Sequence, residues 1–435
     1  MRLFTRAFVA ALFVVPLAAQ DNTELLNRMK VMEDRIKALE AEVQSLKGQA
    51  PPTTAAAPQP VAPPPVEAPA PVQVGGLGPA AAKALNPDIS VIGDFLGAAG
   101  NPANRPTPSL EMHETEVGFQ EVIDPYARAD VFLSFGEHGV DLEEGYLTFT
   151  SLPAGLQVKA GKMRAAFGKV NTLHNHVLPW TDRPLVTQDL VGGEDGINDA
   201  GVSLSRLLPA PKGIFLEGTA QVYRGDSDTV FQSRQRSDLS TVEHLRAYAD
   251  ITESTNIDLG GSFTRGRSPY APAWNQLYGI DATLHWKPLR RAIYHSFVGR
   301  TELIWARTQI NPSFPSISNP FPTVTSAPTR EIRPFGYYVS GDYQFARRWF
   351  LGGRFDQSQR GACQPTVPPT VGTCNRPFTS LVQDTGGSVI VTYWPSEFSQ
   401  IRGQLRRTHY GDSFTTNELL FQIQFSMGAH GAHPF

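Results

Sequence analysis

The chain has 435 residues and a formal net charge of −3, with 41% hydrophobic residues. This near-neutral balance argues against a nucleic-acid partner, which would normally leave a basic stripe on the protein. After the N-terminus, no apolar run approaches the roughly 18 to 20 residues that a membrane helix requires, so any membrane span must consist of β-strands.

Residues 1–20 have the three-part form of a secretory signal peptide. Arg2 and Arg6 precede an apolar run over residues 7–15, and small residues near Ala19 provide a cleavage region. The alternative is a membrane anchor, for which the apolar run is too short. We therefore expect the chain to be exported.

Residues 21–48 carry the heptad pattern of a coiled coil. The apolar seam is Leu25, Met29, Met32, Ile36, Leu39, Val43 and Leu46, and oppositely charged residues flank it. These charges favour self-association over the alternative, a single amphipathic helix docked on the barrel or the membrane. The seam does not distinguish a dimer from a trimer, and the barrel predicted below favours a homotrimer.

Residues 49–87 are rich in proline and alanine, and they cannot bury enough apolar surface to fold. This segment is predicted to be a disordered linker. It would hold the coiled coil in the periplasm as a stalk, where contact with the cell wall is possible.

From residue 88 to residue 435, the sequence alternates between apolar and polar residues in sixteen short stretches. In the last stretch, Leu419, Phe421 and Ile423 share one parity, while Gln422 and Gln424 share the other. A soluble sandwich also alternates, but charged residues on the second face and aromatic residues at the strand ends favour a barrel in lipid. The predicted strands are 88–95, 115–123, 126–135, 140–150, 156–163, 199–208, 213–223, 242–252, 256–266, 275–287, 295–307, 335–346, 348–357, 385–395, 398–408 and 417–427.

The connections between these strands alternate between short turns and long loops. Bacterial barrels place the long loops at the cell surface and the short turns in the periplasm. The fold class predicted is therefore all-β, a 16-stranded antiparallel transmembrane β-barrel, with extracellular loops and with both termini in the periplasm.

A barrel this wide encloses an aqueous channel instead of a packed interior. Acidic residues share the predicted lumen face with basic ones, so neither sign of charge prevails. The arginines predicted to face the lumen are Arg128, Arg246, Arg300, Arg354, Arg402 and Arg406.

The longest predicted loop, 164–198, contains charged, histidine and tryptophan residues. In a wide barrel such a loop can fold inward and narrow the pore, where its side chains act on a solute at close range. The alternatives are a lid packed on the barrel rim and a contact between subunits. We favour inward folding.

Two segments of this region carry a family resemblance. Gly161-Lys162-Met163-Arg164-Ala165-Ala166-Phe167-Gly168-Lys169, followed by Asp182-Arg183-Pro184-Leu185, resembles the strand-end and loop pattern of the phosphate-selective porin family, porins O and P. Residues 88–435 are also similar to uncharacterised outer-membrane proteins labelled zinc-regulated or receptor-like. The porin resemblance implies a sixteen-stranded trimeric barrel with an N-terminal periplasmic segment. By analogy, it implies that Lys162, Arg164, Lys169 and Arg183 contact a passing anion.

The sequence shows no enzyme motif and implies no cofactor. Val117 occupies the position that would complete the zinc-protease pattern beginning at His113, and neither a nucleophile elbow nor a phosphate-binding loop occurs. The pairing of His174 with His176 is a weak metal candidate, because isolated histidine pairs in polar loops are more often solvated. Glu111, His113, Glu114 and Glu116 form another weak candidate, expected at the surface.

Cys363 and Cys374 are the only two cysteines and lie in one proline-rich loop. Their close spacing in an exported protein predicts a disulfide that stiffens this loop, and the alternative is two unpaired thiols.

These patterns together predict a porin of the Gram-negative outer membrane. It would pass small hydrophilic solutes or ions, including anions, by passive diffusion, and would carry out no chemical reaction. The alternatives are a TonB-type energised receptor for a metal or another substrate, which would need a folded plug before the barrel, and a structural tether between the outer membrane and the cell wall.

Overall fold

The computed structural model describes residues 87–100, 108–137, 139–227, 229–311, 328–361, 380–411 and 414–428, together with Lys37. The predicted signal peptide, the linker up to residue 86, and Cys363 and Cys374 lie outside these residues. Lys37 is the one described residue of the predicted coiled coil, and it is helical. Among the described residues, no helix is both long and apolar enough to cross a membrane.

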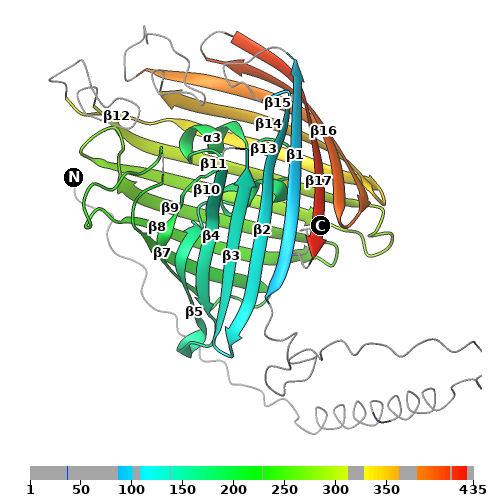
Figure 1. The fold of residues 1–435 in the computed structure, drawn as a ribbon, viewed down its shortest axis with the longest axis horizontal. Coiled ribbons are helices and arrows are strands. Elements are labelled where there is room, and N and C mark those ends of the chain that lie inside the picture. Colours follow the sequence, from blue (N-terminus) through cyan, green and yellow to red (C-terminus); the bar gives the residue numbers. More distant parts are fainter. Residues whose placement is uncertain are drawn as a thin grey trace, which may run out of the picture. The chain divides into compact units, whose positions relative to one another are not determined.

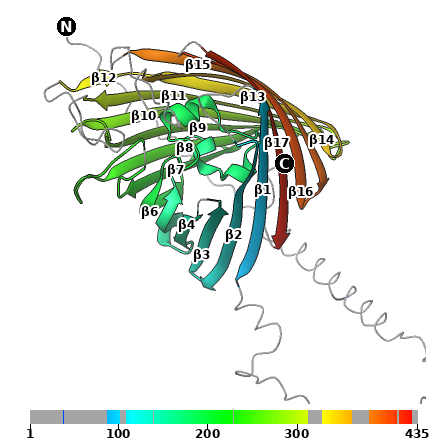
Figure 2. The same cartoon turned by 45° about the horizontal axis from the view of Figure 1, so that its top comes forward.

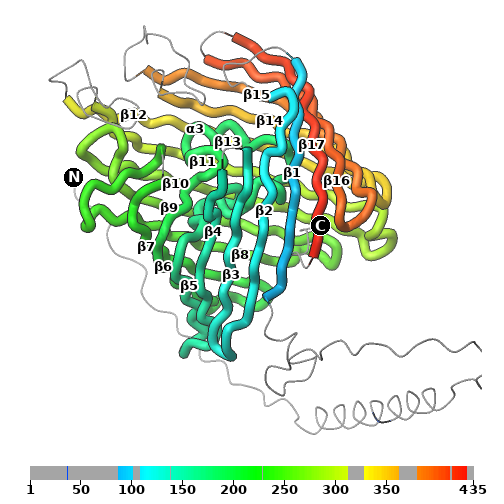
Figure 3. The backbone as a smooth tube through the Cα atoms, viewed as in Figure 1, coloured from blue at the N-terminus to red at the C-terminus, as the bar shows by residue number. Residues whose placement is uncertain are grey.

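The barrel is one closed antiparallel sheet of sixteen long strands and one short strand (Figures 1 and 3). Each long strand pairs with its neighbours in the sequence, and β1 closes the sheet by pairing with both β2 and β17. The strands are β1 (Asp88–Gly100), β2 (Leu110–Asp124), β3 (Ala127–Gly136), β4 (Gly139–Phe149), β5 (Leu156–Arg164), β6 (Asn198–Leu207), β7 (Ile214–Tyr223), β8 (Ser240–Thr252), β9 (Thr255–Arg267), β10 (Trp274–Trp286), β11 (Ser296–Ile310), β12 (Arg330–Ile332), β13 (Phe335–Ala346), β14 (Trp349–Gly361), β15 (Leu381–Ser396), β16 (Ser399–Tyr410) and β17 (Phe414–Gly428). The predicted sixteen-stranded barrel is therefore confirmed, and β12 is a short addition that pairs with the end of β11.

Apolar side chains cover the outside of the barrel, and polar side chains line its inside. On β16, the outward Leu405 is 61% exposed, whereas the inward neighbours Gln404 and Arg402 are 0% and 4% exposed. A soluble protein would bury the leucine and expose the arginine. The reversed arrangement is the one that a β-barrel adopts in a lipid bilayer, with its apolar face toward hydrocarbon.

Several strands extend beyond their predicted ends. The connection between β1 and β2 covers residues 101–109, whereas the sequence predicted a loop over 96–114. Strands β11 and β14 likewise continue to Ile310 and Gly361. These extensions are rich in polar residues and glycine, which weakens the alternating pattern, while the hydrogen bonds of the sheet continue regardless of side-chain polarity.

Candidate functional site

The connection between β5 and β6, residues 165–197, lies inside the barrel, and we call it the inward loop. It contains two short 3-10 turns, η2 (Val170–Thr172) and η3 (Asn175–Val177), and one short helix, α3 (Leu185–Leu190). Figure 2 shows α3 surrounded by the strands of the barrel wall. Inward folding, which the sequence favoured over a rim lid, is confirmed by the contacts described next.

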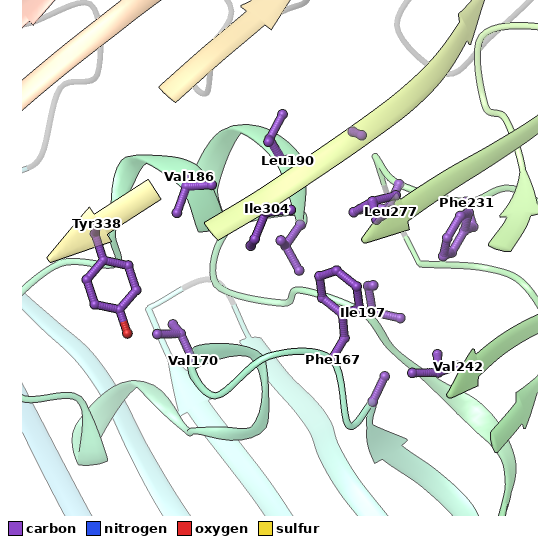
Figure 4. Close-up of a cluster of buried hydrophobic side chains, with 14 of the residues drawn as sticks. Phe167, Val170, Val186, Leu190, Ile197, Phe231, Val242, Leu277, Ile304 and Tyr338 are labelled. Atoms are coloured by element: carbon purple, nitrogen blue, oxygen red, sulfur yellow. The ribbon is translucent and has the colours of Figure 1, made fainter. Parts of the chain in front are cut away.

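One side of the inward loop packs against the barrel wall through apolar side chains (Figure 4). Phe167 and Val186 of the loop belong to one buried cluster with Leu277 on β10 and Ile304 on β11. Trp180 packs edge-on against the Tyr338 ring, with 5.1 Å between ring centroids. Because this apolar packing occurs inside the barrel, the loop is fixed to the wall by a small hydrophobic core of its own.

Carboxylates and arginines attach the loop to several separate strands. Glu302 on β11 accepts hydrogen bonds from the backbone nitrogens of Lys169 and Val170, at 2.8 and 2.6 Å. Asp182 of the loop accepts hydrogen bonds from Arg354 on β14 at 2.9 Å and from Arg406 on β16 at 2.6 Å. The loop therefore extends across the lumen from one part of the wall to another.

Asp182 stays ionised at this position. Burial raises the pKa of the Asp182 carboxyl group, but the neighbouring Arg354 and Arg406 lower it further, and the pKa lies well below the ordinary value of 3.8. The contact therefore joins an ionised carboxylate of the loop to two positively charged arginines of the wall.

A third group of contacts joins the loop to β2 and β4. We call it the histidine–glutamate cluster, and it consists of His174 and His176 of the loop, Glu114 and Glu116 of β2, and Glu143 and Glu144 of β4. All six residues are largely buried. The His174 ring lies between two carboxylates, with Nδ1 2.5 Å from Glu116 Oε2 and Nε2 2.7 Å from Glu144 Oε2.

The cluster concentrates negative charge. Burial lowers the pKa of His174, but its hydrogen bonds with Glu116 and Glu144, together with the negative charges of Glu143 and Glu116, outweigh burial and raise the pKa to about 10. Arg164 adds one further positive charge, through a hydrogen bond to Glu143. The cluster thus favours a cation among its carboxylates.

Two β-bulges turn inward a side chain of the cluster and one beside it, which regular strands would turn outward. The β3–β4 pairing shifts register between Phe132 and Leu133, which makes Glu143 an extra residue, so that Glu143 and Glu144 both point inward. The β1–β2 pairing shifts in the same way between Asp94 and Phe95, which adds His113 to the inward face beside Glu114. Bulges commonly redirect side chains at functional sites.

The four residues predicted to contact a solute differ in how accessible they are. The Lys169 side chain is 40% exposed and the Lys162 side chain 29%, and each lies within 3.5 Å of an aspartate. Arg183 is 2% exposed and donates to the backbone oxygens of Val170 and Leu173. Arg164 is buried against the cluster and also donates to the Glu194 backbone oxygen. Both arginines hold the loop in its fold, and solute contact stays a prediction for all four residues.

The six arginines predicted on the lumen face bond to acidic or polar partners inside the barrel. Arg128 donates to Asp130, Arg246 to Asp258, Arg300 to Asp342, Arg354 to Asp182 and Asp356, Arg402 to Gln422, and Arg406 to Asp182 and Glu418. The charges of all but Arg402, whose partner Gln422 is neutral, are therefore compensated by a neighbouring carboxylate.

Sequence reasoning missed part of this site. His174 and His176 were expected to be solvated, and Glu114 and Glu116 to lie at the surface, but all four are buried in the lumen. The inward folding of the loop explains this difference. Glu143 and Glu144 were not singled out, although two successive glutamates within an alternating strand break the pattern and signal a bulge.

The sequence matches no family model. An uncharacterised protein of Aquifex aeolicus (strain VF5) is 27% identical in an alignment 417 residues long, and the match covers 82% of this chain and 82% of that protein. Among solved structures, an anion-selective porin from Comamonas acidovorans is similar with a TM-score of 0.51 at 9% identity, covering 79% of this chain and 99% of that chain. The outer membrane channel DcaP of Acinetobacter baumannii has a TM-score of 0.48 at 11% identity, covering 79% of this chain and 96% of that chain. The likeness to the Comamonas protein supports the fold.

Proposed function

We propose that this protein is a porin of the Gram-negative outer membrane that passes small hydrophilic solutes or ions by passive diffusion. The observation that carries the proposal is the inward loop, attached by Asp182, Glu302 and the histidine–glutamate cluster to different parts of a polar lumen wall. A loop held in this way narrows a wide barrel without requiring an energy source. The fold shared with an anion-selective porin also favours a channel.

Selectivity by size, more than by charge, follows from the lumen wall. Five of the six predicted lumen arginines pair with a carboxylate within the barrel, which largely cancels their fields, whereas Arg402 bonds to the neutral Gln422. Any preference for anions would depend on Lys162 and Lys169, the more exposed of the four predicted contact residues. The resemblance to phosphate-selective porins therefore does not extend, in our proposal, to phosphate selectivity.

The proposed assembly is a homotrimer with the coiled coil in the periplasm and the long loops at the cell surface. The alternation of short and long connections supports this orientation. Loss of trimers on deletion of residues 21–48 would support a role for the coiled coil in assembly, whereas unchanged trimers would assign assembly to the barrel.

Solute flux tests the function directly. Liposomes containing the purified protein should swell in small sugars, and the swelling rate should fall as sugar size increases. A salt gradient across a planar bilayer should give only a small reversal potential. Absence of swelling with every sugar, from a barrel that is folded by circular dichroism, would contradict the porin and favour a tether.

A further inference from the structure

We propose that the histidine–glutamate cluster is a binding site for a divalent transition-metal ion, Zn²⁺ above all, with His174, His176 and Glu116 as ligands. This inference concerns an ion bound within the lumen wall, and it does not depend on the passage of solutes. Three observations carry it: buried polar atoms without hydrogen-bond partners, the distances between the candidate ligand atoms, and the contact of the second His174 ring nitrogen with Glu144.

Three buried atoms of the cluster have no hydrogen-bond partner among the described residues. They are His176 Nδ1, Glu114 Oε1 and Glu143 Oε2, and the residues that carry them are 7%, 5% and 6% exposed. A buried polar group without a partner destabilises the fold, so these three atoms indicate a site that a ligand would complete. His176 and Glu114 face each other, and Glu143 faces His174.

The separations among these atoms are longer than hydrogen bonds and close to the edges of a metal coordination shell. His176 Nδ1 lies 3.5 Å from Glu116 Oε2 and 3.6 Å from Glu114 Oε1, and His174 Nδ1 lies 3.6 Å from Glu143 Oε2. Ligand atoms at about 2.0–2.1 Å from a tetrahedral zinc ion are about 3.3 Å apart. The three proposed ligand atoms all lie within 4.8 Å of one another.

The short contact between His174 Nδ1 and Glu116 Oε2, at 2.5 Å, is a hydrogen bond. Metal binding would displace the proton of this bond. The distance between the two atoms would then need to increase by less than about 1 Å to match the spacing of ligand atoms around zinc. Glu114 Oε1 and Glu143 Oε2 are both near enough to complete the shell as a fourth ligand.

His174 is also supported in the way that metal-binding histidines usually are. Its other ring nitrogen, Nε2, lies 2.7 Å from Glu144 Oε2. A carboxylate that accepts the second ring N–H fixes the orientation of the imidazole and increases its basicity as a ligand. Glu144 points inward because of the bulge in β4, so the distorted strand provides the supporting residue.

The ligand set favours zinc over harder ions. Two imidazole nitrogens with one or two carboxylate oxygens suit Zn²⁺ and its neighbours in the transition series, whereas Mg²⁺ and Ca²⁺ prefer an all-oxygen shell. A bound ion would connect the inward loop, through His174 and His176, to Glu116 of the wall. Its consequence would be a loop held more firmly in the lumen.

Metal binding to the full-length protein in detergent tests the proposal. After dialysis against Zn²⁺ and removal of free ion, the native protein should retain one zinc ion per chain, measured by mass spectrometry of the metal. With Co²⁺ in place of Zn²⁺, the native protein should show the visible absorption of a tetrahedral cobalt centre with nitrogen ligands. No retained zinc, or an octahedral cobalt spectrum, would overturn the proposal.

Four variants locate the ion. His176→Gln and Glu116→Gln should lose the retained zinc, and Glu144→Gln, which changes only the supporting residue, should weaken binding by about 10- to 100-fold. His285→Gln, on β10 and outside the cluster, should bind zinc as the native protein does. Equal zinc binding by His176→Gln and the native protein would assign the ion to other histidines and would overturn the site. Circular dichroism confirms folding of each variant, and the cobalt spectrum of the native protein tests the site without any substitution.

Discussion

The carboxylate of Asp182 accepts a hydrogen bond of 2.6 Å from Arg406, 224 residues further along the chain. The first residue lies in the middle of the inward loop and the second on β16, so the bond closes the loop onto a distant part of the wall. Arg354 on β14 bonds to the same carboxylate oxygen at 2.9 Å. Asp182 thus helps to compensate two buried positive charges, together with Asp356 beside Arg354 and Glu418 beside Arg406.

Replacement of Asp182 by asparagine should release this end of the inward loop. Arg354 keeps Asp356 as a partner and Arg406 keeps Glu418, so the loss should be smaller than the roughly 3–5 kcal/mol of a buried charge left without any counter-charge, and it falls on the contact between the loop and the wall. We expect single-channel recordings of Asp182→Asn to show noisier current with frequent transitions between levels. Asp250→Asn, an exposed aspartate at the end of β8, is the control and should record like the native protein. Quiet currents from Asp182→Asn would mean that this bond does not hold the loop.

The same contact predicts resistance of the loop to mild acid. Since the folded-state pKa of Asp182 lies below the ordinary value of 3.8, its stabilising effect is complete above that value and is lost only as the pH falls through the lower, folded-state pKa. The difference in current noise between the native protein and Asp182→Asn should therefore stay constant from neutral pH down to the ordinary aspartate pKa. A noise transition at higher pH that is absent from Asp182→Asn would contradict this assignment.

Replacement of Trp180 by alanine should widen the lumen. The Trp180 side chain is buried between the Tyr338 ring and the Arg354 guanidinium. The guanidinium carbon lies 4.9 Å from the centroid of the Trp180 ring. Loss of a buried tryptophan costs about 3–5 kcal/mol and leaves a space next to the loop. Liposome swelling should admit larger sugars with Trp180→Ala than with the native protein. Trp349→Ala, which removes a half-exposed ring stacked on Tyr393, should leave the size limit unchanged.

A charge introduced on the outer face should destabilise the barrel in lipid. Leu245 on β8 is 49% exposed and points outward. Its partner on β7 is Gly218, and the next residue, Thr219, points inward at nearly the same depth. Arginine on the lipid face costs about 2–4 kcal/mol near the bilayer midplane. Urea unfolding in lipid vesicles should show this loss for Leu245→Arg and a smaller one for Thr219→Arg, at nearly the same depth. Equal losses for the two variants would argue against lipid on the outside.

The wall of the barrel could be predicted from the sequence because each strand repeats one physical rule. Outward residues such as Leu405 and Leu419 are apolar, inward ones such as Gln404 and Gln422 are polar, and a shift by one residue would reverse both faces. Sixteen repetitions of this rule gave the number of strands, although the polar strand ends extended beyond the prediction.

The site inside the barrel could be predicted only in part. The content of the inward loop indicated its importance, but the partners of His174 come from β2 and β4, and no local pattern specifies such distant contacts. The two successive glutamates Glu143 and Glu144 signal a bulge in β4, but which of them becomes the extra residue depends on how β3 and β4 pair, which is a property of two strands together.

The current through single molecules in a planar lipid bilayer tests the central claim most directly, namely that solvent passes through the lumen beside the inward loop. The purified, folded protein should produce discrete current steps of uniform size at constant voltage. A folded protein that inserts into the bilayer and stays electrically silent would contradict the account.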